Sequence, residues 1–191
     1  MTGRFIAIVG PSGVGKDSVM EALSTAEPKL HLVRRVITRP GDAGGEAFDA
    51  VPEAEFLQQK ARGDFALSWQ AHGLRYGIPA TTLKDIAEGR DMLANLSRSV
   101  LPAAKAVFPR FQVIVLTASR DALAMRLAAR NRETPKDIAG RLDRADFAMP
   151  PDIPAFEVDN SGPLGQTARA ILSHLATGPS AQRPETCESQ T

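Results

Sequence analysis

Cysteine is almost absent from the sequence, and so are the features that direct a chain into or across a membrane. The 191 residues include one cysteine, Cys187, which excludes an internal disulfide framework and fits a reducing compartment. No apolar run approaches membrane-spanning length. The first apolar residues lead into a glycine-rich loop rather than into a signal-peptide cleavage site. We therefore expect a cytoplasmic protein.

A strong net charge is also lacking. The 23 basic and 22 acidic residues leave a formal net charge of +1, so no global field draws the chain to nucleic acid or to a membrane surface. Hydrophobic residues make up 43% of the sequence, which is enough for one sizeable core. We expect one compact α/β unit that acts on small molecules, with its oligomeric state left open.

What is present is a strand followed by a phosphate-binding loop. Residues 5–9 are apolar and rich in β-branched side chains, which predicts a buried parallel strand. The pattern G-x-x-x-x-G-K follows at once. Its glycines let the backbone wrap a polyphosphate, and the helix behind it adds a positive end. The residues expected to bind the nucleotide are Gly10, Pro11, Ser12, Gly13, Val14, Gly15, Lys16, Asp17 and Ser18.

Three residues at the end of this loop have a predicted chemical role. Lys16 is expected to reach the β- and γ-phosphates as a mobile point charge and to act in catalysis. Asp17 stands where the pattern usually has the Ser or Thr that holds Mg²⁺. A carboxylate is also a hard oxygen ligand, so we predict Asp17 and the neighbouring Ser18 as magnesium ligands. In the alternative interpretation, Asp17 only favours the first turn of the helix.

Strand and helix alternate along the rest of the chain, which predicts a parallel sheet with helices on both faces. Further strands are expected at 30–37, 91–96, 113–116 and 156–160, and helices at 18–24, 81–88, 100–108, 119–131, 134–147 and 165–176.

Residues 38–80 break this alternation. They predict a small mixed α/β insertion with a helix at 52–62, a strand at 65–70 and a turn at 72–79. We expect residues 1–176 to form one domain and the polar residues 177–191 to be a disordered tail.

Arginines gather around the turn between the two helices of 119–147. They are Arg126, Arg130, Arg132, Arg141 and Arg144. Such a helix pair can be a solvated surface or a lid that closes over phosphates. Beside a phosphate loop we favour a lid at 126–147, because arginine stabilises the charge of a transferring phosphoryl group. Arg130, Arg132 and Arg141 are its predicted catalytic residues.

The same residues resemble the guanylate kinase family over residues 3–176. The resemblance rests on the loop 10–16, the pair Thr38-Arg39 followed by Glu46, the segment from Trp69 to Tyr76-Gly77, and the arginine-bearing helix pair. It implies a P-loop NTPase fold with a parallel core, an insertion that binds the phosphate acceptor, and a helical lid.

Several positions depart from the guanylate kinase pattern. Asp42 replaces a second arginine that grips the acceptor phosphate. Ser68 replaces a glutamate that reads guanine, and Ile78 replaces a hydroxyl residue that helps to read it. Asn95 and Ser97 replace an Asp-x-Asp sequence. A base that has lost its hydrogen-bonding partners should bind much more weakly.

These substitutions resemble another branch, the ribose 1,5-bisphosphate phosphokinases of phosphonate catabolism, which make 5-phosphoribosyl 1-diphosphate. The shared stretches are 15–18, 66–69, 71–74, 76–77 and Asn95-x-Ser97-Arg98. This resemblance implies ATP and Mg²⁺ as cofactors, and it puts Asn160 near the adenine. It implies a substrate site formed by Arg35, Arg39, Glu46, Ser68, Tyr76, Asn95 and Arg98.

Other interpretations stay open. Arg75 and Arg98 can be ordinary surface charges, Trp69 is expected in the core, and His72 is expected to be structural or to contact a sugar hydroxyl. A guanylate kinase is one alternative function, and Ser68 and Ser97 argue against it. A second alternative is a non-catalytic binding module, and the intact phosphate loop argues against it. A third is a regulatory NTP-binding protein.

Overall fold

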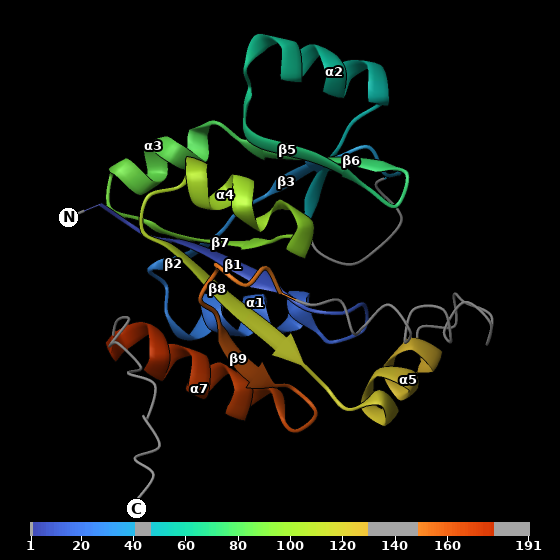
Figure 1. Cartoon of the computed structure of the whole chain (residues 1–191), viewed down its shortest axis with the longest axis vertical. Helices are drawn as coiled ribbons and strands as arrows, with labels where there is room; N and C mark the ends of the chain where they lie inside the picture. The colour runs from blue at the N-terminus through green and yellow to red at the C-terminus, as the bar shows by residue number, and fades with distance from the viewer. Residues whose placement is uncertain (1, 41–46, 130–148, 178–191) are drawn as a thin grey trace, which may run out of the picture.

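The computed structural model describes residues 2–40, 47–129 and 149–177, which build two sheets (Figure 1). The main sheet has the parallel order β2 (Leu30–Leu32), β7 (Asp91–Asn95), β1 (Phe5–Val9), β8 (Phe111–Thr117), β9 (Phe156–Asp159). The small sheet is mixed and has the order β4 (Phe48–Ala50), β3 (Arg35–Ile37), β6 (Leu74–Pro79), β5 (Phe65–Ala71).

The main sheet is covered on both faces, as the sequence predicts. All five residues of β1 are buried, and they alternate between two apolar clusters. Phe5, Ala7 and Val9 pack with α3 (Thr81–Ala87) and α4 (Leu101–Val107), whereas Ile6 and Ile8 pack with α1 (Lys16–Ala26) and α7 (Leu164–Thr177). A short 3-10 turn, η1 (Arg98–Val100), precedes α4. Figure 1 shows the two helix layers on opposite sides of the strands.

The single strand predicted at 30–37 is wrong, because the structure has two strands there, in different sheets. β2 pairs with β7 of the main sheet, and β3 pairs with β4 and β6 of the small sheet. The backbone N–H of Val33 still donates to Leu93 O, and the chain crosses to the small sheet after that residue. No glycine or proline marks the crossing, so the apolar pattern continues through it.

The turn predicted at 72–79 is also wrong beyond its first two residues. His72 and Gly73, with φ of 52° and 74°, form the turn, and β6 then pairs antiparallel with β5. Gly77 and Pro79 weaken the strand pattern of β6. Gly77 is nevertheless suited to its place, because a Cβ there would lie 2.6 Å from the ring of Phe65. The sequence pattern also missed β4.

The remaining elements agree with the expected pattern. The small sheet and α2 (Glu53–Arg62) form the expected small mixed insertion. α5 (Arg120–Ala129) is capped as expected, because the backbone N–H of Ala122 donates to Ser119 Oγ at 3.2 Å. The helix expected at 134–147 lies outside the described residues, as does the expected tail except for Thr177, which ends α7. No helix in the described part of the chain is both long and apolar enough to cross a membrane.

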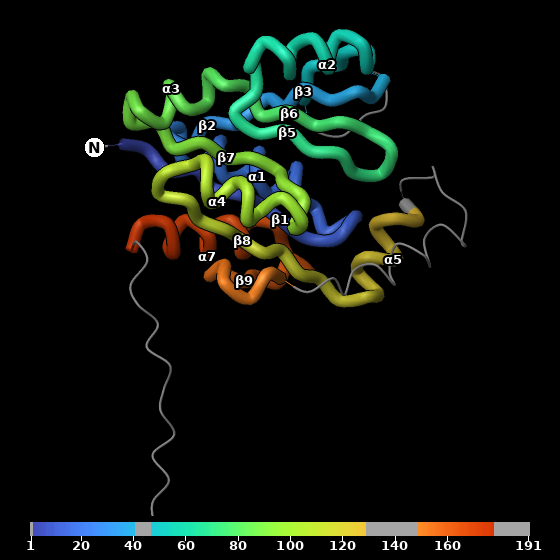
Figure 2. Tube along the Cα trace, turned by 45° about the horizontal axis from the view of Figure 1, so that its top comes forward, coloured from blue at the N-terminus to red at the C-terminus, as the bar shows by residue number. Residues whose placement is uncertain are grey.

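The carboxyl ends of four parallel strands meet at one edge of the main sheet. Ile8 of β1 is level with Asn95 of β7, Val9 with Val115, and Thr117 of β8 with Asp159 of β9. In Figure 2, α5 lies beyond this end of β8, apart from the helices that cover the sheet. Ligands of open α/β sheets bind at this edge, and the phosphate loop, Asn95 and Asn160 all lie there.

Candidate active site

The phosphate loop begins where β1 ends and closes at the first residue of α1. Gly15 caps this helix in the left-handed region, with φ of 94°. A Cβ at this position would lie 2.9 Å from Asn160 Nδ2. Gly13 is also left-handed, with φ of 85°, and faces Leu127 of α5. The loop therefore needs glycine for its backbone angles and for its close neighbours.

Lys16 lies inside the curve of this loop. Its Nζ donates to Gly10 O at 2.9 Å and to Pro11 O at 3.1 Å. Lys16 is partly buried, so its ammonium group stays at the loop instead of extending into solvent. An ammonium group at this location can neutralise the β- and γ-phosphates of a nucleotide wrapped by the loop.

Asp17 faces the end of β7. Its Oδ1 accepts a hydrogen bond from Asn95 Nδ2 at 3.4 Å, whereas Ser18 is exposed on the first turn of α1. The described residues contain no group of three or more His, Cys, Asp or Glu side chains that could hold a metal ion by themselves. Mg²⁺ commonly binds to one or two protein oxygens together with substrate phosphates and water, so Asp17 and Ser18 fit such a partial site.

An open pocket borders Asp17, beside α1 and the crossing that leads from β2 to the small sheet. Its lining residues are Asp17, Met20, Glu21, Leu32, Val33, Arg34 and Ala47. They come from α1, from β2 and the crossing after it, and from the residue before β4. The pocket therefore opens from the phosphate loop toward the small sheet.

Arg35 lies on the aromatic side of the small sheet. Its guanidinium carbon is 5.1 Å from the ring centre of Tyr76 and 5.9 Å from that of Trp69. These two rings are a cross-strand pair of β5 and β6, stacked at 5.2 Å with planes 12° apart. Only 6% of Arg35 is exposed, and cation–π contacts of this kind gain strength when water is excluded.

Two hydrogen bonds join this cluster to the end of β7. Arg35 NH1 donates to Asn95 O at 2.8 Å, and Trp69 Nε1 donates to Ser97 Oγ at 3.1 Å. Because Asn95 also contacts Asp17, an unbroken series of contacts runs from Asp17 at the end of the phosphate loop through Asn95 and Arg35 to Tyr76. Four of the predicted site residues, Asp17, Asn95, Arg35 and Tyr76, therefore belong to one connected group.

Trp69 packs against the core, as expected, but it is only half-buried. Its ring stacks on Tyr76 and its N–H donates to Ser97 Oγ, next to Arg98 of the predicted site. A lone tryptophan gives no periodic signal. Recognising β6 as a strand would have paired Trp69 with Tyr76 and pointed to this contact.

The other predicted acceptor residues that the structure describes are Ser68, Arg39 and Arg98. Ser68 is half-buried on β5, opposite Gly77. Arg39 stacks over Phe48, with its guanidinium carbon 4.3 Å from the ring centre. Burial lowers the pKa of Arg98 from its ordinary value, and the Glu157 carboxylate acts in the opposite direction. An arginine stays charged despite such a shift.

Arg75 is engaged elsewhere, since its Nε donates to Glu53 Oε1 at 2.7 Å. This favours the interpretation of Arg75 as a structural surface charge. Glu46, Arg130, Arg132 and Arg141 lie outside the described residues, so their predicted roles stay predictions.

Asn160, the residue after β9, holds the phosphate loop through a buried hydrogen bond. The residue is 4% exposed; its Nδ2 donates to Val14 O at 2.8 Å, and its Oδ1 accepts from Thr167 Oγ1 at 2.7 Å. Arg126 of α5 donates to the same Val14 O at 3.2 Å and to Asn160 O at 2.7 Å. Both ends of the Asn160 amide are therefore used within the protein, which favours support of the loop over recognition of adenine.

Replacing Asn160 with alanine is expected to raise KM for ATP about tenfold, because the loop carbonyl of Val14 loses a buried donor. Thr167→Val removes the hydroxyl that contacts Asn160 Oδ1 and Asp159 O but leaves the donor to Val14 O in place, and it is expected to have a smaller effect. Steady-state kinetics with varied ATP measure both. An unchanged KM for ATP in Asn160→Ala would remove Asn160 from the nucleotide site.

Comparison with known proteins agrees with a phosphate-binding site. No protein-family model matches the chain. The chain is similar to ribose 1,5-bisphosphate phosphokinase PhnN of Ruegeria sp. (strain TM1040), with 51% identity over 89% of this chain and 92% of the relative. It is also similar to the protein of that name from Agrobacterium fabrum, with 44% identity over 94% of this chain and 100% of the relative.

Solved structures share the fold. A guanylate kinase from Anaplasma phagocytophilum superimposes with a TM-score of 0.62 at 18% identity, over 92% of this chain and 86% of that one. A gluconokinase from Sinorhizobium meliloti 1021 gives a TM-score of 0.55 at 19% identity, over 92% of this chain and 93% of that one. These likenesses confirm the predicted P-loop α/β fold. Because the curated relatives are far more similar and match over nearly their whole length, the chain belongs to the ribose 1,5-bisphosphate phosphokinase family.

Proposed function

We propose that the protein transfers the γ-phosphoryl group of ATP to the 1-phosphate of ribose 1,5-bisphosphate. The products are ADP and 5-phosphoribosyl 1-diphosphate. The names of the relatives support this reaction, and the connected group from Lys16 and Asp17 to Arg35 and Tyr76 supplies the residues that it needs.

The observation that carries the choice of acceptor is the buried Arg35 beside Tyr76 and Trp69. The Arg35 side chain comes from β3 of the small sheet. The same sheet carries Ser68, at the position where a guanylate kinase has the glutamate that recognises guanine. An arginine fork suits phosphate oxygens, and its stacking on rings keeps it oriented. A sugar with two phosphates offers more charge to such a site than a nucleobase does.

The chemistry requires little from a general base. The acceptor is a phosphate oxygen that is already largely ionised at neutral pH, so catalysis consists of positioning and charge neutralisation. Lys16 and the loop amides hold the β- and γ-phosphates. Mg²⁺, when bound, neutralises the same phosphates, and Asp17 and Ser18 are the residues that would hold it.

The acceptor side takes its charge from several arginines. Arg35 and Arg39, with Arg98 at the start of η1, would hold the sugar bisphosphate together with Ser68, Tyr76 and Asn95. From outside the described residues, Glu46 would join them, and Arg130, Arg132 and Arg141 would close over the transferring phosphoryl group.

A coupled assay with Mg-ATP and two acceptors tests the proposal. We expect ribose 1,5-bisphosphate to be converted to the diphosphate, with kcat/KM for GMP at least about a hundredfold lower, because the base has no carboxylate partner. A preference for GMP would contradict the acceptor while leaving phosphoryl transfer in place. Inactivity toward both acceptors would instead favour a non-catalytic binding module.

A further inference from the structure

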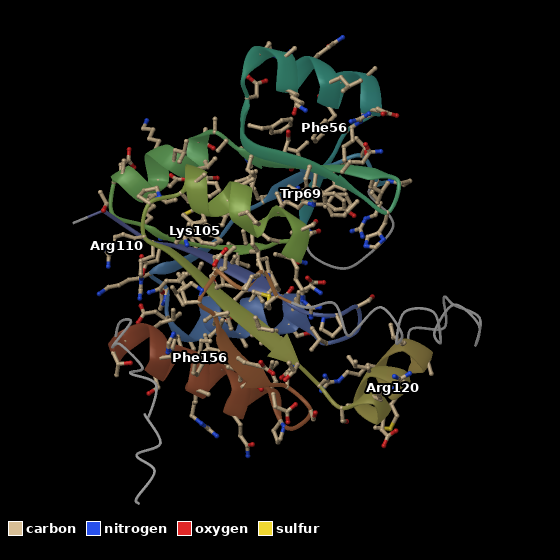
Figure 3. The ribbon with its side chains drawn as sticks, viewed as in Figure 1. Phe56, Trp69, Lys105, Arg110, Arg120 and Phe156 are labelled. Atoms are coloured by element: carbon tan, nitrogen blue, oxygen red, sulfur yellow. The ribbon has the colours of Figure 1, made fainter. Side chains whose placement is uncertain are left out.

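Trp69 of the small sheet contacts both its own sheet and the loop that follows β7 of the main sheet. It stands on β5, paired across the hairpin with Tyr76, and the two rings stack at 5.2 Å. In Figure 3, Trp69 lies on the face of the small sheet that is turned toward α4, opposite the face on which Phe56 lies. The only tryptophan of the chain is therefore at the junction of the two sheets.

The indole is fixed by a directional contact. Its Nε1 donates to Ser97 Oγ at 3.1 Å, two residues beyond the end of β7. A half-buried indole N–H needs an acceptor, and in this structure the acceptor lies on the loop that follows β7 of the main sheet rather than on the sheet that carries the ring. The hydrogen bond thus sets the plane of the ring relative to β7.

The orientation of the Arg35 side chain depends on the plane of the Trp69 ring. Its guanidinium lies over Tyr76 and Trp69, and its NH1 reaches Asn95 O at 2.8 Å. A long cationic side chain loses considerable rotamer entropy when it is held, and the two rings and the carbonyl contribute to holding the Arg35 guanidinium in place. A ring free to tilt would leave the guanidinium with only part of this support.

We propose that Trp69 is a positioning residue for the phosphate acceptor, and that it acts through its hydrogen bond to Ser97 by orienting Arg35. The inference rests on the proposed function, because it assigns Arg35 to the acceptor. Trp69 itself need not touch the sugar. The expected signature is a defect in acceptor binding with ATP binding left intact.

Paired variants isolate the hydrogen bond. Trp69→Phe keeps a ring and removes Nε1, Ser97→Ala removes the acceptor, and Ser97→Thr keeps the hydroxyl as the matched control. We expect each of the first two to raise KM for ribose 1,5-bisphosphate about tenfold, with KM for ATP and the melting temperature nearly unchanged. The double variant should be no worse than the worse single one, because both remove the same bond. Ser97→Thr should behave as the parent protein.

Two kinetic results would overturn the inference. One is an unchanged acceptor KM in both Trp69→Phe and Ser97→Ala. The other is an equal rise in KM for ATP and for the acceptor together with a lower melting temperature, because that pattern indicates a general loss of structural stability. If Trp69→Phe does not fold, Ser97→Ala carries the test alone, since Ser97 is half-buried at a loop.

Fluorescence separates this inference from the proposed function. The protein has a single tryptophan, so its emission reports Trp69 alone. Ser97→Ala is expected to change the emission maximum and the anisotropy of Trp69, and Ser97→Thr to restore them, whatever the acceptor is. If the parent protein does not phosphorylate ribose 1,5-bisphosphate, the proposed function fails. If Ser97→Ala leaves the emission unaltered, the positioning role fails.

Discussion

Replacing Lys16 with methionine is expected to lower kcat for phosphoryl transfer by at least about a thousandfold, because charge neutralisation at the phosphates supplies most of the catalysis in such enzymes. Methionine keeps the length of the side chain and removes the ammonium group that lies against Gly10 O and Pro11 O. Initial rates with saturating ATP and acceptor measure the effect.

Lys105→Met is the matched control for this loss of charge. Lys105 is exposed on α4 and donates to Asp152 O at 3.0 Å, and Figure 3 shows it on α4, away from the phosphate loop. We expect this variant to keep the activity of the parent protein. A Lys16→Met protein that is folded and retains more than about a tenth of the parent kcat would contradict the catalytic role of Lys16.

Replacing Asp17 with alanine is expected to lower kcat about a hundredfold and to raise the concentration of free Mg²⁺ needed for half-maximal rate, because a hard oxygen ligand is lost. Asp17→Ser restores the residue type that is usual at this position of the loop. It should recover most of the activity, since a hydroxyl oxygen can replace the carboxylate. Rates measured across a Mg²⁺ titration at fixed ATP compare the two variants.

The two interpretations of Asp17 predict different results here. If Asp17 only favours the first turn of α1, alanine should lower the free energy of unfolding by about 0.5 kcal/mol and leave the Mg²⁺ dependence unchanged. Asp17→Ser would then behave like Asp17→Ala. Chemical denaturation of both variants, beside the Mg²⁺ titration, distinguishes a ligand from a helix-end charge.

The main sheet could be predicted from the sequence because its central strands are buried on both faces. β1 and residues 113–116 of β8 are short continuous apolar runs, and this pattern indicates a parallel strand without any knowledge of its neighbours. The phosphate loop could be predicted for a related reason. Its glycines and Lys16 meet local backbone requirements that tertiary contacts do not change.

The small sheet was harder to predict because its pairing is non-local. β3 continues the pattern of β2 without a break, and β6 contains Gly77 and Pro79, which argue against a strand when read alone. Gly77 is explained only by the ring of Phe65, twelve residues earlier. The contact between Trp69 and Ser97 likewise joins residues whose adjacency follows from how two sheets meet.

The crossing after Val33 makes the small sheet and α2 one continuous segment of the sequence. The chain leaves the main sheet once after β2 and returns once at α3, which packs against β7, the neighbour of β2. The proposed acceptor residues of the small sheet are thus encoded in one uninterrupted stretch of sequence. Relatives can exchange this part of the proposed site as one segment, provided that the new segment matches Leu67 and Ile78 in the shared core and remains compatible with Asn95 and Arg98, which lie outside it.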